Sequence, residues 1–138
     1  MNLPAHLRHR VVERANNRCE YCGLSQEGQE AVFHIDHVVP RSTRGKTMLS
    51  NLALACVSCS LRKAARRTAT DPETSHVIPL FNPRREIWNS HFRWRGTQVV
   101  GTTPTGRATV AALKMNRSLA RAIREEEVAR RRHPPAAQ

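Results

Sequence analysis

The stretch that decides the fold runs from His34 to Lys63. It reads HIDHVVP at 34–40, then a polar loop, then SNL at 50–52, and finally CVSCSLRK at 56–63. It combines an Asp beside a His, an Asn after a loop, and a Cys-x-x-Cys ahead of a basic run. These are residue types that carry metal and acid–base chemistry at such spacings. The candidate functional site is therefore expected in this stretch.

The local pattern predicts a strand, a loop, a second strand and a helix. The first strand is expected at residues 31–39, and Pro40 ends it because proline cannot extend a ladder of hydrogen bonds. The loop follows at 41–48, the second strand at 51–55 and the helix at 57–67. Ahead of them, Leu7, Val11 and Ala15 recur every four residues, which predicts a helix at 5–17.

The second half of the chain carries weaker signals. Residues 68–83 are turn-rich and are expected to wrap over the domain. Apolar residues between Ile87 and Val100 predict a hairpin with its turn at Gly96 and Thr97. Helices are expected at 106–116 and 118–132, and a frayed tail at 133–138. The predicted fold class is α+β, with a domain at 1–69 and an extension at 70–138 packed on it.

Length and charge limit the possible functions. A chain of 138 residues suits one ordinary domain, and with 4% aromatic residues its core is expected to be modest and to benefit from a metal. The net charge of +12 indicates a polyanionic partner such as nucleic acid. The competing interpretation is a basic protein from a GC-rich genome. No apolar run approaches membrane-spanning length and the start lacks the apolar segment of a signal peptide, so a cytoplasmic protein without a membrane partner is expected.

The four cysteines form two pairs of the Cys-x-x-Cys type. The first pair is Cys19 and Cys22, and the second is Cys56 and Cys59. Two such knuckles can supply four thiolates in a tetrahedron, which suits a structural Zn²⁺ because no coordination position stays open. In a reducing compartment this is favoured over two disulfides or four buried free thiols.

Together these residues resemble the HNH endonucleases, a family of the ββα-metal (His-Me finger) nucleases. The resemblance covers residues 11 to 67. It implies a small ββα-metal domain with zinc knuckles that hydrolyses DNA phosphodiester bonds with a divalent cation. It further implies that His37 is the general base and that Asp36 is a ligand of Mg²⁺ or Mn²⁺. Asn51 would brace the loop and help to orient His37.

Ser60 departs from the family pattern, in which the residue after the last cysteine is usually Asn or His and completes the metal shell. A serine hydroxyl is a weak neutral ligand on a shorter arm. Three interpretations stay open: a water replaces the missing ligand, His34 contributes because residues 34 and 36 share a face of a regular strand, or the site is degenerate. In the last case the chain is a zinc-containing module that binds nucleic acid without cleaving it.

Basic side chains flank the expected site on both sides. Residues of the loop and of the helix are expected to contact phosphates, which gives affinity without sequence readout. They are Arg41, Arg44 and Lys46 on the loop, and Arg62, Lys63 and Arg66 on the helix. DNA is the expected partner, with RNA as the alternative. A solvated helix face is the competing interpretation for Arg66.

Overall fold

The computed structural model describes residues 3–136. The chain begins with α1 (Ala5–Arg14), whose Val11 side chain is fully buried. The helix ends earlier than residue 17, where the sequence pattern predicts its end. Asn16 and Asn17 both have positive φ, 53° and 56°, and such left-handed residues cannot continue a right-handed helix.

The predicted strand, loop, strand and helix are all present. β1 (His34–His37) pairs antiparallel with β2 (Leu52–Ala55), with His34 opposite Ala55 and Asp36 opposite Ala53. α2 (Val57–Lys63) follows directly. The strands and the helix are shorter than expected. The helix ends because Ala64 has φ 46° and ψ −124°, outside the helical region.

The segment 68–83 differs from its prediction, because it contains a hairpin. β3 (Thr68–Thr70) pairs antiparallel with β4 (Val77–Pro79). The hairpin predicted between Ile87 and Val100 is confirmed as β5 (Phe92–Arg95) and β6 (Gln98–Gly101), with Gly96 at φ 59° in its turn. The described residues thus hold three separate two-stranded sheets.

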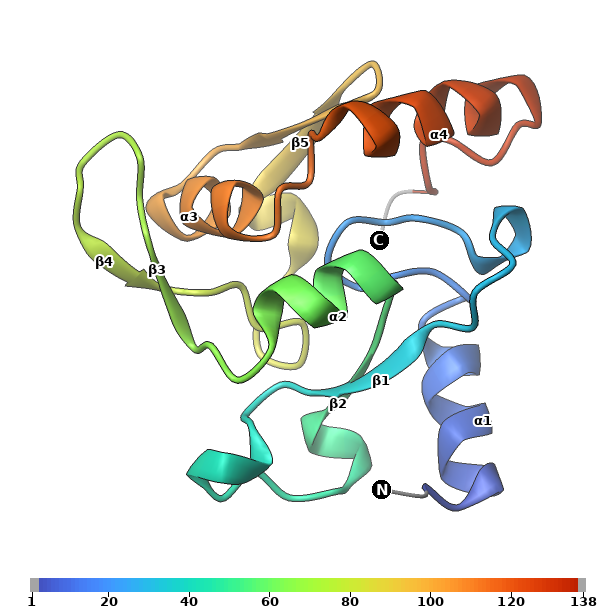
Figure 1. The fold of residues 1–138 in the computed structure, drawn as a ribbon, viewed down its shortest axis with the longest axis vertical. Coiled ribbons are helices and arrows are strands. Elements are labelled where there is room, and N and C mark those ends of the chain that lie inside the picture. The colour runs from blue at the N-terminus through green and yellow to red at the C-terminus, as the bar shows by residue number, and fades with distance from the viewer. Residues whose placement is uncertain (1–2, 137–138) are drawn as a thin grey trace.

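Two helices close the fold. α3 (Pro104–Ala112) starts two residues before its predicted bound because the Thr103 hydroxyl accepts the Gly106 N–H and Pro104 occupies the first turn. α4 (Ser118–Ala129) confirms the last predicted helix and ends three residues before its predicted bound at 132. Figure 1 places α4 and the loop between β1 and β2 at opposite ends of the long axis of the molecule, with α2 between them.

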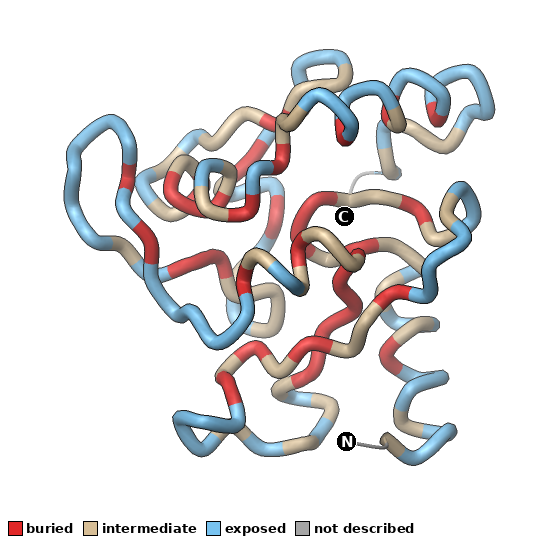
Figure 2. Tube along the Cα trace, in the orientation of Figure 1, coloured by how far each residue is buried: buried red, intermediate tan, exposed pale blue. Residues whose placement is uncertain are grey.

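The core draws side chains from both halves of the chain. Leu52 and Leu54 of β2 share one cluster with Phe81, Trp88 and Phe92 from the extension. Trp88 Nε1 donates to the Tyr21 carbonyl at 2.8 Å, between the first two cysteines. Figure 2 shows β2 buried along its whole length, whereas the loops at the lower end and left side are exposed. No helix in the described part of the chain is both long enough and apolar enough to cross a membrane.

Candidate active site and zinc cluster

The four cysteines meet in one buried cluster. Their Sγ atoms all lie within 4.8 Å of one another, and no disulfide joins them. In each knuckle the first sulfur accepts a backbone N–H three residues on, Cys22 N to Cys19 Sγ and Cys59 N to Cys56 Sγ, both at 3.4 Å. Four thiolates this close together in a buried site would repel one another unless a cation lay between them. The cluster therefore fits the Zn²⁺ site that the sequence predicts.

The zinc cluster connects the N-terminal knuckle to β2 and α2. Cys56 is the N-cap residue of α2, so the helix starts at the cluster. Beside it, Glu20 N donates to the Leu54 carbonyl and Leu54 N donates to Glu20 Oε2, each at 2.8 Å. The cluster consequently fixes the helix that faces β1.

His37 lies at the end of β1 and is half-buried. Its Nε2 is 2.8 Å from Thr47 Oγ1, in the loop between the two strands. Burial first, and the charge of Arg41 second, hold the pKa of His37 below its usual value. The imidazole is therefore neutral at neutral pH, which is the form that accepts a proton.

Asn51 braces the loop, as its place in the motif suggests. Its Oδ1 accepts the Val39 N–H at 2.8 Å, and its Nδ2 donates to the carbonyls of Val39 at 3.0 Å and Lys46 at 2.9 Å. Gly45 is also required here, because a Cβ at that position would lie 1.7 Å from the Val39 oxygen. Asn51 thus holds the loop backbone that follows His37.

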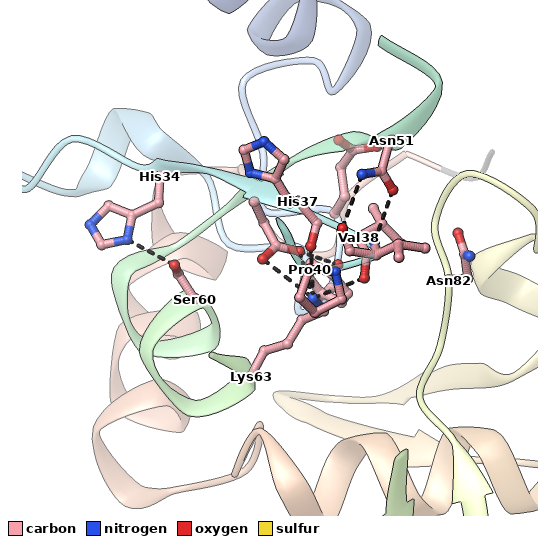
Figure 3. Close-up of polar contacts among 12 residues, drawn as sticks. His34, His37, Val38, Pro40, Asn51, Ser60, Lys63 and Asn82 are labelled. Carbon is pink, nitrogen blue, oxygen red and sulfur yellow. Dashed lines mark hydrogen bonds and ion pairs between the residues drawn. The ribbon is translucent and has the colours of Figure 1, made fainter. Parts of the chain in front are cut away.

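His34 and Ser60 are neighbours across the gap between β1 and α2. His34 Nδ1 lies 2.8 Å from Ser60 Oγ, and Figure 3 shows the two side chains pointing toward one another. Two adjacent ligands of a cation with bonds of about 2.1 Å are roughly 3 Å apart. With the Asp36 carboxylate on the same face of β1, this donor set fits a hard divalent cation in its chemistry.

The Asp36 carboxylate is, however, already bound by two partners. Asp36 is 8% exposed, and its Oδ2 accepts the Tyr21 hydroxyl at 2.6 Å and lies 3.1 Å from the Lys63 ammonium. Lys63 also donates to the carbonyls of His37 at 3.1 Å and Val38 at 3.2 Å. A cation at Asp36 must therefore share the carboxylate with Lys63.

This arrangement corrects the expectation for Lys63. Only 2% of its surface is exposed, and its three acceptors match the three donors of an ammonium. Lys63 therefore does not face phosphates from the surface of α2. It holds Asp36 and the end of β1 instead.

The other predicted basic residues do not form one surface. Arg41, Arg44 and Lys46 are exposed on the loop. Arg44 and Lys46 line a groove of about 290 Å³ beside Asn51. Arg62 instead donates to Ser58 Oγ at 3.2 Å and lines a separate groove on α2, and Arg66 is exposed beyond the helix.

Two residues beside the site carry no motif signal of their own. Tyr21 lies inside the first Cys-x-x-Cys, so only its position in the knuckle could have drawn attention to it. Thr47 is one of several hydroxyl residues in the loop, and nothing in the sequence distinguishes it as the partner of His37. Both contacts depend on how the chain folds around β1.

Comparison with known proteins gives one match. The family description HNH endonuclease matches residues 19–66, a segment that contains both cysteine pairs, His37 and Asn51. No curated protein and no solved structure matches the chain. The family match, the zinc cluster and the strand–loop–strand–helix order agree with one another. Residues 19–66 are therefore an HNH endonuclease family domain.

Proposed function

We propose that this protein is a metal-dependent endonuclease that hydrolyses DNA phosphodiester bonds, with His37 as the general base. The observation that carries the proposal is the state of His37, which is neutral, half-buried and held by Thr47 at the end of β1. A general base must be unprotonated at the working pH and fixed in orientation. His37 meets both requirements inside the segment that matches the family.

In the proposed mechanism the two ring nitrogens of His37 have different tasks, with Nε2 bound to Thr47. A neutral imidazole has one N–H donor and one acceptor nitrogen. With the proton on Nε2, Thr47 Oγ1 accepts it, and Nδ1 carries the lone pair that removes a proton from the attacking water. The ring is then held in the tautomer and orientation that the reaction needs.

The candidate cation ligands lie on the other face of β1 from His37. Residues 34 and 36 alternate with residue 37 along the strand, and Figure 3 shows His37 directed away from Ser60 and Lys63. A divalent cation held by Asp36, Ser60 and His34 would supply positive charge for the leaving oxygen. For an in-line displacement, the water activated by His37 must attack the phosphorus opposite the leaving oxygen.

The proposal is tested by incubating zinc-loaded protein with supercoiled plasmid in Mg²⁺, in Mn²⁺ or in excess chelator. We expect nicking that requires the divalent cation and shows weak sequence preference. Zinc content is measured before and after, so that loss of the structural metal is not mistaken for loss of the catalytic one. Failure of the zinc-loaded wild type to cleave single-stranded and duplex DNA under all cation conditions would refute the proposal.

A second candidate function is binding of nucleic acid without cleavage. The ion pair between Asp36 and Lys63 favours it, because the carboxylate charge is already balanced inside the fold. Ser60→Asn separates the two functions by restoring the amide usual in the family. A weakly active nuclease should gain cleavage in this variant, whereas a binding module should remain inactive and keep its affinity for DNA.

A further inference from the structure

The extension and the β1–β2 loop together line the groove that contains Arg44 and Lys46. The turn at residues 82–85 contributes Asn82, Arg84 and Arg85 to it. This turn is distant in sequence from the loop, and no motif points to it. Figure 3 shows Asn82 on the neighbouring segment, on the side of the site where Asn51 lies.

The groove lies next to the proposed base in the chain, although His37 itself does not line it. Val38 and Val39, which follow His37 directly, form part of its lining. Lys46, also in the lining, precedes the Thr47 that contacts the His37 ring. A chain that lay in the groove would therefore pass beside His37.

Three of the four cations around the groove have no acidic partner in the described part of the chain. No ion pair among residues 3–136 involves Arg44, Lys46 or Arg85, although other surface arginines, such as Arg130 with Glu126, are paired. All three are exposed. Three unpaired cations around one groove favour a ligand with several negative charges along its length.

The turn that carries Arg85 is held in place before any ligand arrives. Asn82 Oδ1 accepts the backbone N–H groups of Arg84 at 2.9 Å and Arg85 at 3.2 Å. Glu86 Oε1 accepts the Asn82 N–H at 2.8 Å. The Arg84 guanidinium forms an ion pair with Glu20, beside the zinc cluster. Arg84 thus anchors the turn and leaves Arg85 free to bind.

We propose that this groove binds the phosphodiester backbone of the nucleic-acid strand and that Arg85 of the extension contacts a phosphate there together with Arg44 and Lys46. The inference rests on the proposed function, since it supplies the path by which the strand reaches His37. It assigns one part of the substrate-binding groove, the turn at residues 82–85, to the region outside residues 19–66. The groove is not expected to give sequence specificity, because contacts to phosphates do not distinguish one base from another.

Binding of short random-sequence DNA duplexes, single strands and RNA duplexes tests this role without relying on cleavage. The variant is Arg85→Gln, and the matched control is Arg95→Gln. Arg95 is exposed beside the β5–β6 turn, whose Thr97 carbonyl accepts a hydrogen bond from Arg124 of α4. Affinity is measured by fluorescence anisotropy between roughly 50 and 200 mM salt, where phosphate contacts have a strong effect.

Arg85→Gln should weaken binding about tenfold at low salt and reduce the slope of log affinity against log salt by about one. Arg85→Lys should restore most of the affinity, and Arg95→Gln should leave it within about twofold. Lys46→Gln provides a second variant on the opposite wall, with the same expected loss.

Equal losses in Arg85→Gln and Arg95→Gln would overturn the inference, because they would reflect net charge alone. Absence of binding by the zinc-loaded wild type to all three nucleic acids would also overturn it. A wild type that binds through Arg85 but never cleaves would leave the groove assigned and refute the nuclease. The nucleic acid that binds most tightly, among DNA duplexes, single strands and RNA duplexes, identifies the class of substrate that the groove accepts.

Discussion

At the scale of single residues, the orientation of His37 depends on Thr47. Replacing Thr47 with Val removes the hydroxyl contact to Nε2 and keeps the shape of the side chain. We expect the cleavage rate to fall about tenfold or more, the scale on which outer hydrogen-bond partners of site histidines act. Thr47→Ser keeps the hydroxyl and should retain most of the rate. Single-turnover cleavage of a labelled duplex measures both, and equal rates in Thr47→Val and wild type would exclude a positioning role.

Lys63 carries a second prediction at this scale. Lys63→Met leaves Asp36 as a buried charge without a counterion, and losses of about 3–5 kcal/mol are typical when one member of a buried pair is removed. Urea unfolding of the zinc-loaded variant should show this loss. The double variant Lys63→Met with Asp36→Asn should recover part of it, because no net charge then stays buried. A single variant as stable as wild type would contradict the role given to Lys63.

The sequence could predict the residues of the candidate site better than their contacts. Asp36, His37, Asn51 and the cysteines stand out because their spacing matches a known motif. Lys63 could not be placed, because a lysine in a basic run looks exposed until the fold brings Asp36, 27 positions earlier, against it. The Tyr21 hydroxyl was missed for the same reason, since its partner comes from a different element.

At the scale of elements, Asp71 joins the β3–β4 hairpin to α3. Asp71 is fully buried, and its carboxylate accepts two hydrogen bonds from Arg107, at 3.0 Å and 2.9 Å. The hydrogen bonds from Arg107 hold the pKa of Asp71 well below its usual range. The folded state therefore binds this proton less readily than the unfolded state. The stabilisation is present above the unfolded pKa of about 4 and is lost as the pH falls toward the folded pKa.

Asp71→Asn should accordingly lower stability most near neutral pH and flatten the loss of stability on acidification. Thermal unfolding of wild type and variant between neutral and acidic pH measures the difference. Glu73→Gln is the control, because Glu73 contacts the same Arg107 from an exposed position. If the stability of Asp71→Asn differed from that of the wild type by the same amount at every pH, the pH dependence assigned to Asp71 would be wrong.

The elements differ in how far local sequence determines them. The β1–β2 pair and α2 follow from their motif, and the β5–β6 hairpin follows from its apolar strands and Gly96. The β3–β4 hairpin could not be predicted from the sequence, because each strand has only three residues. Three residues are too few to show an alternation of polar and apolar side chains. The early end of α2 at Ala64 could not be predicted either, because alanine is the strongest helix former and its propensity favours continuing the helix.

At the scale of the whole molecule, the zinc cluster is expected to hold the two halves of the core together. We expect one Zn²⁺ per purified chain by elemental analysis. Its removal should abolish cooperative unfolding, because binding of a structural zinc contributes on the order of 10 kcal/mol in small domains, comparable to total stability. Cys56→Ser should reproduce the effect, and re-addition of Zn²⁺ should reverse chelation in the wild type. Unchanged unfolding after verified zinc loss would contradict this assignment.

The central claim is that His37 performs the chemistry and does not merely contribute to binding. The most direct measurement compares cleavage rate and DNA affinity on the same zinc-loaded samples of wild type, His37→Ala and His76→Ala, an exposed histidine in the β3–β4 turn. We predict that His37→Ala loses about 10²–10⁴ in rate, with affinity near that of wild type, while His76→Ala changes neither. A His37→Ala variant that cleaves as fast as the wild type would show that His37 is not the general base.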